Sequence, residues 1–327
     1  MSYFYLFTSC IPVKGYNRSL IVDTQRKIFF FIPNALYHIL SECRTKTVRG
    51  IRSSFEQKNI VDEYFDFLIN ENLGMYINSL KKFPPLNMEY DVPRQITNAI
   101  IEVSEKSEHN YDSIISQLSQ LNTEALELHL YDRPSISCII NIMNKIQGSS
   151  LRSITIIMPY LEGTEMFNVL DKYPRITSLI FYNSGKDDGL IYNENVKVLY
   201  KRQKDISPEN CGNISPKYFS FNLNHVCESL CYNICLNKKL CITIDGKIKN
   251  CPGCVEDFGN VNKDLLCTVI NSAKFQRMWK IKKDDIKVCK DCEMRYICHD
   301  CRIHIVDKNN IYSKPSKCSY NPYKSEW

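Results

Sequence analysis

The hydrophobic pattern of the first eighty residues predicts a small module of three strands followed by three helices. Its strands are short apolar or β-rich runs separated by turn-forming residues. In the last helix, which begins at Asn59, apolar side chains recur at i, i+4 and i+8 on one face. The strands are expected at 4–10, 18–23 and 27–32, and the helices at 34–43, 47–57 and 59–73. This order predicts a winged-helix-like module over residues 1–82.

The middle of the chain, after a probable linker at Phe83-Pro-Pro-Leu86, alternates strand and helix patterns. Strands are expected at Ile96–Glu102, Ala125–Leu130, Ser153–Met158, Ile176–Tyr182 and Val196–Tyr200, and helices at 111–121, 134–146 and 163–172, with Pro134 and Gly163 near helix starts. Alternation at this interval is typical of βαβ units around a parallel sheet. The predicted fold class is therefore α/β, with a partial parallel β/α barrel over 90–210.

The C-terminal third is rich in cysteine, since twelve of the sixteen cysteines lie between Cys227 and Cys318. Their spacing is Cys235-x5-Cys241-x9-Cys251, then Cys289-x2-Cys292-x5-Cys298-x2-Cys301, and finally Cys318. Thiols at such regular spacing, in a chain without a secretory signal, indicate metal ligands rather than a disulfide framework.

Zinc and iron–sulfur clusters are the two candidates for this metal. Zinc ribbons separate their two CxxC pairs by roughly fifteen to twenty residues, but here only the five residues Glu293 to Ile297 lie between the pairs. Tight spacing with further single cysteines supplied from far away favours iron–sulfur clusters, which are commonly held by four thiolates each. Such clusters are anionic, and basic residues near the ligands would offset the charge: Lys280, Lys282, Lys283, Lys287, Lys290, Arg295 and Arg302.

In this chain, Gly246-x4-Cys251 lies inside the Cys241-x9-Cys251 interval. This pattern, with the CxxC-x5-C run and the last single cysteine, resembles the SPASM domain of radical-SAM peptide maturases. More narrowly, three segments are similar to the grasp-with-spasm peptide maturase family: Ile244 to Pro252, Val288 to Tyr296 and Asn321 to Trp327. The resemblance covers most of the chain and is strongest after residue 220, so a SPASM domain is expected over 220–327.

The resemblance implies two [4Fe–4S] clusters, a ribosomally made precursor peptide and an ATP-grasp ligase as partner. The first cluster would take Cys235, Cys241, Cys251 and Cys301, and the second Cys289, Cys292, Cys298 and Cys318. The family spaces the last two cysteines of its run by three residues, whereas only His299 and Asp300 stand before Cys301. His299 or Cys254 could therefore replace Cys301 as a ligand.

The N-terminal module resembles the leader-peptide-binding domain at the front of many peptide-modifying enzymes. Such a domain takes the leader as an added strand beside a helix, with main-chain hydrogen bonds for affinity and pockets for specificity. A scaffold that only packs on the next domain is the alternative. A DNA-binding winged helix is not expected, because the helix 59–73 carries four acidic residues and no basic face.

The loop that carries the CxxxCxxC motif in radical-SAM proteins corresponds to Val103–Tyr111, which contains no cysteine. S-adenosylmethionine is therefore not an expected cofactor. Cys227-x3-Cys231-x3-Cys235 imitates the motif with a last spacing one residue too long. If residues 225–240 are helical, these three cysteines share one face, as core residues or as ligands.

Composition excludes several other classes of protein. The net charge of +6 is modest and its basic residues are scattered, so nucleic acid is not an expected partner. No apolar run approaches the ~20 residues that span a bilayer, and no signal-peptide pattern opens the sequence, so no membrane partner and a reducing cytoplasm are expected.

The sequence thus predicts a peptide-maturation protein that binds and presents a precursor through a module attached to an iron–sulfur domain. No catalytic residue can be named. One alternative is an active radical-SAM enzyme using Cys227, Cys231 and Cys235, and another is a zinc-stapled adaptor protein.

Overall fold

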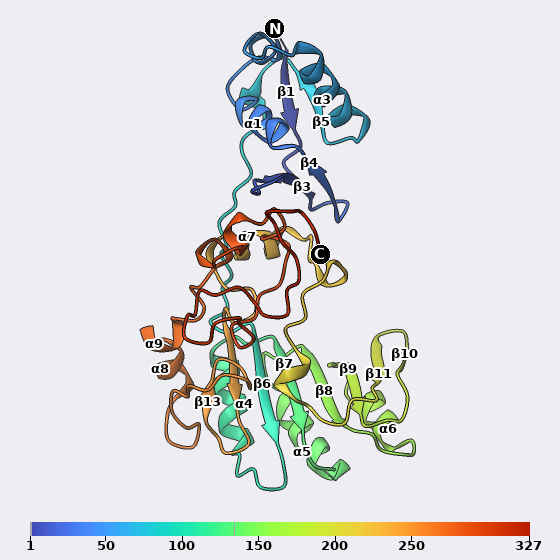
Figure 1. Ribbon diagram of the computed structural model, residues 1–327. Helices are drawn as coiled ribbons and strands as arrows, with labels where there is room; N and C mark the ends of the chain where they lie inside the picture. The colour runs from blue at the N-terminus through green and yellow to red at the C-terminus, as the bar shows by residue number, and fades with distance from the viewer. Residues whose placement is uncertain (1, 134) are drawn as a thin grey trace. The chain divides into compact units, whose positions relative to one another are not determined.

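The computed structural model describes residues 2–133 and 135–327, whose elements are drawn in Figure 1. The chain forms two compact units, and it passes between them more than once. Unit 1 consists of Met1–Asp91, Gly212–Ile234 and Ile281–Trp327, and unit 2 of Val92–Cys211 and Cys235–Lys280. The cysteine-rich region is divided between the units, so this grouping differs from the three ranges expected from the sequence.

The N-terminal part of unit 1 contains three strands that form one sheet and three helices near their predicted positions. They are β2 (Cys10–Val13), β3 (Ser19–Asp23), β4 (Ile28–Ile32), α1 (Asn34–Glu42), α2 (Val48–Ser53) and α3 (Lys58–Asn70). The strands form an antiparallel sheet in the order β2-β3-β4. The strand expected at 4–10 corresponds to β1 (Tyr3–Leu6), which pairs with β5 (Gly74–Ile77); neither β2 nor β5 was predicted.

The central strand β3 is buried over its whole length because both faces of its sheet are covered. Ile21 packs with apolar residues of α1 and α3 in one core cluster. Leu20 and Val22 point the other way and pack with Met294 and Ile297 of the cysteine-rich segment in a second cluster. A strand buried on both faces reads as a continuous apolar run, which explains the sequence of β3.

Unit 2 is built on an open eight-stranded sheet in the order β10-β11-β9-β8-β7-β6-β12-β13. The strands from β11 to β12 are all parallel, and β10 and β13 are antiparallel edges. The bounds are β6 Asn98–Val103, β7 Ala125–Leu130, β8 Ser153–Pro159, β9 Ile176–Tyr182, β10 Asp188–Tyr192, β11 Val196–Tyr200, β12 Lys239–Ile242 and β13 Ile248–Lys249. The predicted mixed α/β class with a largely parallel sheet is confirmed.

The helices between the parallel strands of unit 2 are amphipathic and follow their predicted positions. They are α4 (Tyr111–Gln120), α5 (Ile136–Ile146) and α6 (Glu165–Lys172), which bury one apolar face each. Two helix starts show side-chain caps, since Asn110 accepts a hydrogen bond from the Ser113 N–H and Ser135 from the Cys138 N–H. The predicted start at Pro134 lies outside the described residues.

The remaining elements are short. They are α7 (Leu223–Cys231), α8 (Leu266–Ile270), α9 (Ala273–Gln276) and the 3₁₀ turns η1 (Leu80–Lys82), η2 (Pro208–Asn210), η3 (Pro216–Tyr218), η4 (Lys283–Asp285) and η5 (Cys289–Asp291). The condition under which Cys227, Cys231 and Cys235 would share one helix face, a helix over 225–240, is not met, because α7 ends at Cys231. The reason lies in Asn233, which is buried and whose amide donates to Asp300 Oδ2 at 2.6 Å and to the Ile281 carbonyl at 3.2 Å. These hydrogen bonds to distant segments hold the residues around Asn233 in a non-helical conformation.

Candidate metal centre

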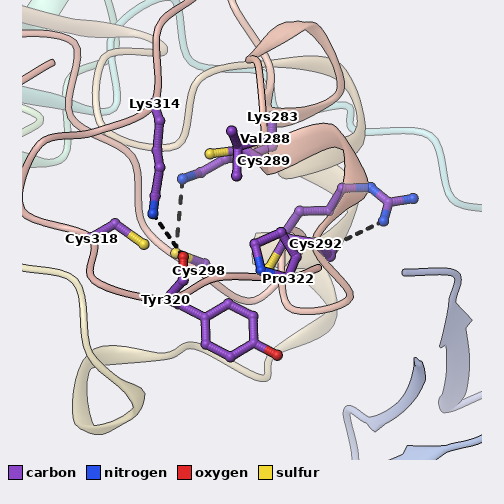
Figure 2. Close-up of a pocket in the computed structure, with 10 residues that line it drawn as sticks. Lys283, Val288, Cys289, Cys292, Cys298, Lys314, Cys318, Tyr320 and Pro322 are labelled. Carbon is purple, nitrogen blue, oxygen red and sulfur yellow. Dashed lines mark hydrogen bonds between the residues drawn. The ribbon is translucent and has the colours of Figure 1, made fainter. Parts of the chain in front are cut away.

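Four of the predicted ligands lie around one cavity in unit 1, as Figure 2 shows: Cys289, Cys292, Cys298 and Cys318. The cavity has a volume of about 20 Å³ and is partly open to solvent. Lys283, Arg295, Lys314 and Tyr320 also line it. These are the four cysteines that the family resemblance assigns to the second cluster.

Tight turns around the cysteines bring them to the cavity. The Cys292 N–H donates to the Cys289 carbonyl at 3.0 Å, and the Cys298 N–H donates to the Met294 carbonyl at 3.1 Å. Val288, which also lines the cavity, has a φ of +68°. For a β-branched residue, a positive φ carries a strain of order 1–3 kcal/mol. Such strained residues are often found at active sites and ligand-binding sites.

Lys283 brings a buried positive charge to this cavity. Its side chain is 4% exposed, and its Nζ lies 3.8 Å from Cys298 Sγ and 3.5 Å from Asp300 Oδ1. Burial alone would lower the pKa of Lys283, but the negative charges of Cys298, Asp300 and Cys289 outweigh burial and raise it. Asp300 is already paired with Arg302 at 2.6 Å. Two buried cations therefore share one carboxylate, and the local excess of positive charge suits an anionic partner in the cavity.

Burial favours the protonated form of three of these thiols, Cys289, Cys292 and Cys298. It raises the pKa of Cys298 to about 12, although the neighbouring Lys283 acts in the opposite direction, and burial likewise raises the pKa of Cys289 and Cys292. Thiolates are the form that binds metal. Four thiols around one cavity beside an excess buried cation fit a four-thiolate iron–sulfur cluster, which is anionic overall.

The N-terminal sheet packs directly on the loop that carries these cysteines. Glu293, which follows Cys292, is 0% exposed, and its carboxylate accepts from Arg18 Nε at 2.8 Å and from the Tyr320 hydroxyl. Beside this ion pair, the second core cluster joins β2 and β3 to Met294, Ile297 and Tyr320. The cysteine loop and the N-terminal module are thus one packed structure within unit 1.

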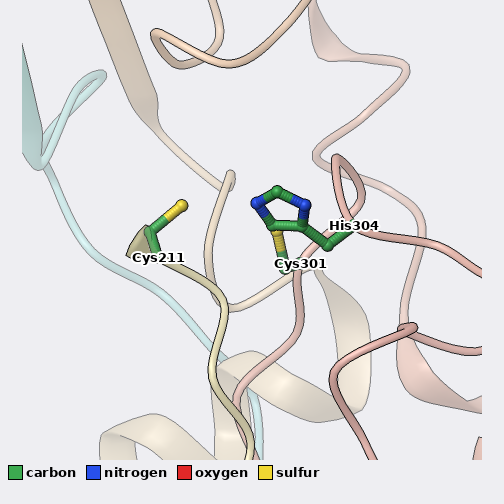
Figure 3. A group of neighbouring side chains, drawn as sticks. All are labelled: Cys211, Cys301 and His304. Atoms are coloured by element: carbon green, nitrogen blue, oxygen red, sulfur yellow. The ribbon is translucent and has the colours of Figure 1, made fainter. Parts of the chain in front are cut away.

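The cysteines expected to hold the first cluster are divided between the two units. Cys235, Cys241 and Cys251 belong to unit 2, where Cys241 lies in β12 and Cys251 follows β13, whereas Cys301 belongs to unit 1. Cys301 is buried beside His304 (Figure 3), and Gly212 lies against it so closely that an added Cβ would be 2.9 Å from Cys301 Sγ.

A further cysteine of unit 2 accompanies this set. The sulfurs of Cys251 and Cys254 lie 3.5 Å apart. The sequence analysis named Cys254 only as a substitute ligand, although Cys251-Pro-Gly-Cys254 is itself a CxxC pair that could have been read from the spacing.

The alternative ligand set Cys227, Cys231 and Cys235 does not share one helix face. Cys227 is buried in α7, Cys231 is exposed at its end, and Cys235 lies beyond the helix in unit 2. The cysteine-free loop after β6 folds back on its own strand, since the His109 ring lies 2.8 Å from the Glu102 carbonyl.

Comparisons with known proteins give only distant matches. No protein-family model and no curated protein matches the sequence. The crystal structure of Streptococcus suis SuiB bound to S-adenosylmethionine is 11% identical, with coverage of 97% of this chain and 100% of that one and a TM-score of 0.44. SuiB alone is 10% identical (96% and 99%, TM-score 0.45), and SuiB bound to precursor peptide SuiA is 10% identical (97% and 100%, TM-score 0.34).

At these identities and scores the likeness to SuiB carries no argument about function. The function proposed for this chain therefore rests on the arrangement of its own residues and on the sequence resemblance described above. Within residues 2–133 and 135–327, no helix combines the length and apolar character needed to cross a lipid bilayer.

Proposed function

We propose that this chain is a maturation protein for a ribosomally made peptide, which holds iron–sulfur clusters and binds the precursor through its N-terminal module. The observation that carries the proposal is the cavity lined by Cys289, Cys292, Cys298 and Cys318, directly beneath the N-terminal sheet. A peptide-binding module and a cysteine-lined site that share one core are expected to act together.

In this proposal the second cluster takes Cys289, Cys292, Cys298 and Cys318, and the first takes Cys235, Cys241 and Cys251 with one further ligand. When bound, a four-iron cluster cross-links the loops that supply its thiolates and can exchange single electrons. Lys283 offsets its negative charge. Because the loop after β6 has no cysteine, we assign the chain a binding and presenting role, without S-adenosylmethionine.

The surface proposed for the precursor is the free edge of β4 beside α3. β4 is an edge strand, and Phe30 on it lies against Phe67 of α3 with ring centroids 6.1 Å apart. Ile28 and Phe31 of β4 are large apolar side chains that are 39% and 40% exposed. An exposed edge with apolar side chains is the feature that an added peptide strand uses.

The proposed partner that receives the presented peptide is an ATP-grasp ligase. This part of the proposal rests on the likeness of the segments 244–252, 288–296 and 321–327 to the grasp-with-spasm family. The presenting role requires that one chain bind the precursor and the ligase at the same time.

The test of metal content is iron, sulfide and zinc analysis of anaerobically purified protein. About eight irons and eight sulfides per chain are expected, four of each per cluster. In Cys292→Ala the iron content is expected to fall by about half. Zinc without sulfide would contradict the proposal and favour an adaptor protein.

The test of precursor binding is titration calorimetry with a candidate precursor peptide. Lys27→Glu and Asp66→Lys place reversed charges at β4 and α3, and both are expected to weaken binding. Glu56→Lys, an exposed change in the loop before α3, is the matched control. Unchanged affinity in the first two variants would remove this surface from the proposed function.

A further inference from the structure

A tight turn in unit 2 brings the sulfurs of Cys251 and Cys254 into contact. The segment Cys251-Pro252-Gly253-Cys254 is closed by a hydrogen bond from the Cys254 N–H to the Cys251 carbonyl at 3.1 Å. Proline and glycine at the two central positions favour such a turn, which holds the Cα atoms of its first and last residues within about 7 Å. The two sulfurs are 3.5 Å apart. Four consecutive residues are therefore enough to place the two thiols side by side.

The geometry of this pair is close to that of a disulfide. Disulfides join cysteines whose Cα atoms are about 4.4–6.8 Å apart, and their sulfurs are about 2.05 Å apart. The sulfurs of Cys251 and Cys254 need to approach each other by about 1.5 Å to reach this distance. A disulfide can thus close inside the turn by a small movement of the two side chains.

The loop that carries the pair is anchored at its base and exposed at its tip. At the base, the Phe258 N–H donates to the Ile248 carbonyl at 2.9 Å, and the side-chain amide of the buried Asn250 donates to the Phe275 carbonyl at 3.1 Å. At the tip, Val255 is 96% exposed. The anchored base keeps the turn in place, while a dissolved reagent can reach the tip.

The two thiols differ in exposure. Cys251 is half-buried, whereas Cys254 is 8% exposed. In thiol–disulfide exchange, one thiolate attacks the disulfide of the reagent, and a neighbouring thiolate then attacks the mixed disulfide that results. The difference in exposure assigns the first step to Cys251 and the second to Cys254, which is shielded from the reagent but touches Cys251.

We infer that Cys251 and Cys254 form a redox-active dithiol, which small-molecule disulfides such as oxidised glutathione convert into an internal disulfide. The Cys251 thiolate attacks one sulfur of oxidised glutathione and releases the other as a glutathione thiolate. The Cys254 thiolate then attacks the Cys251 sulfur and releases the second glutathione thiolate. The two protons lost by the cysteines pass to the released thiolates through solvent, so one molecule of oxidised glutathione is reduced for each disulfide formed.

This dithiol also bears on the first cluster, and that consequence alone rests on the proposed function. Iron is bound by thiolates, and a sulfur in a disulfide is not a thiolate. The internal disulfide and a cluster held by Cys251 therefore exclude each other. The oxidation state of the turn then determines whether Cys251 is available to the first cluster, whereas the four cysteines around the cavity in unit 1 are not involved.

The experiment treats the full chain, freed of metal and reductant, with oxidised glutathione in the absence of oxygen and then alkylates the remaining thiols with N-ethylmaleimide. Trypsin releases residues 250–263 as one peptide, in which Cys251 and Cys254 are the only cysteines. This peptide is expected to lose both alkylation sites together with the mass of two hydrogen atoms, and dithiothreitol should restore both sites. Cys267, an exposed single cysteine on α8, is the internal control and should carry glutathione instead.

Two variants test the assigned roles. Cys254→Ser should accumulate the glutathione adduct on Cys251. Cys251→Ser should leave the buried Cys254 unmodified in the folded chain and let it react like Cys267 in guanidinium, so this comparison also shows that the chain is folded. Retention of both alkylation sites in the unmodified chain, while Cys267 carries glutathione, would overturn the inference. A glutathione adduct that persists on Cys251 beside an intact Cys254 would overturn it as well.

Treatment of the iron-loaded protein separates this inference from the proposed function. In anaerobically purified protein with about eight irons per chain, oxidised glutathione should leave the peptide 250–263 without the disulfide, because Cys251 is held by the cluster. Equal disulfide formation in the loaded and metal-free proteins would refute Cys251 as a cluster ligand and would leave the dithiol established. A chain that forms the disulfide but is purified without iron and sulfide would refute the proposed function itself.

Discussion

Replacement of Lys283 by methionine should have opposite effects on the cluster-loaded and the metal-free protein. Methionine keeps most of the apolar stem and removes the charge. Lys283 Nζ lies 3.8 Å from Cys298 Sγ, which would be a thiolate in the loaded protein. Two opposite unit charges about 4 Å apart interact by about 4 kcal/mol at an effective dielectric constant near 20. Because the buried ammonium also loses its hydration, the net loss in Lys283→Met should be about 2 kcal/mol.

In the metal-free protein the same change should cost nothing or stabilise the fold. Burial then favours the protonated form of Cys289, Cys292 and Cys298, and Asp300 keeps its partners Arg302 and Asn233, both at 2.6 Å. Lys283 is there a buried cation in excess, and removing such a charge is neutral or favourable. The sign of the stability change therefore reports whether an anionic group occupies the cavity.

The assay is anaerobic guanidinium unfolding of both forms, followed by tryptophan fluorescence and, for the loaded form, by visible absorption of the cluster. Lys290→Met, an exposed neighbour of Cys289, is the matched control and should leave both forms unchanged. Equal destabilisation of both forms by Lys283→Met would refute the charge argument, since only lost packing of the stem would explain it.

Three further changes test the core and the loop after β6. Arg18→Met leaves the fully buried carboxylate of Glu293 without its cation and should lower the free energy of unfolding by about 2–3 kcal/mol, whereas Arg52→Met, whose pair with Asp62 is exposed, should cost about 0–1 kcal/mol in the same guanidinium titration. Ile297→Ala, at a position 0% exposed, should lower the free energy of unfolding by about 2–5 kcal/mol, whereas Val255→Ala, at a position 96% exposed, should leave it unchanged. Equal guanidinium midpoints for the two variants would contradict the packing of the cysteine loop on β3. Burial lowers the pKa of His109, so as the pH falls the His109 ring is protonated in the unfolded chain before it is protonated in the folded protein. The free energy of unfolding should therefore decrease below about pH 6.5. His109→Gln should flatten this part of the pH–stability curve, and an unchanged slope would refute a contribution from His109.

The sequence was sufficient for the local elements because their patterns are periodic. β7, β9 and β11 have the bounds expected from apolar runs, and α4 ends one residue before the prediction. Cysteine spacing also singled out Cys289, Cys292, Cys298 and Cys318, which line one cavity. Local propensity and ligand spacing depend on residues that are close together in the sequence, so both can be predicted without a structure.

Contacts between distant segments could not be read in this way. The sequence of β3 does not predict that Val22 packs against the loop of Met294 and Ile297, which is more than 250 residues away in the chain. For the same reason the sequence left open whether a helix continues through 225–240. The hydrogen bonds of Asn233 with Ile281 and Asp300, which lie beyond the end of α7, depend on how the chain returns.

Charge and ligand choice were likewise decided by tertiary structure. The sequence offered seven basic residues as equivalent counter-charges. Burial distinguishes Lys283 and Arg302 from the exposed Lys287 and Lys290, and the Lys283 ammonium lies 3.8 Å from Cys298 Sγ. The strength of a charge interaction depends on distance and on exclusion of water. Along the chain alone, a cysteine is a candidate ligand, and only the fold brings Cys254 to 3.5 Å from Cys251.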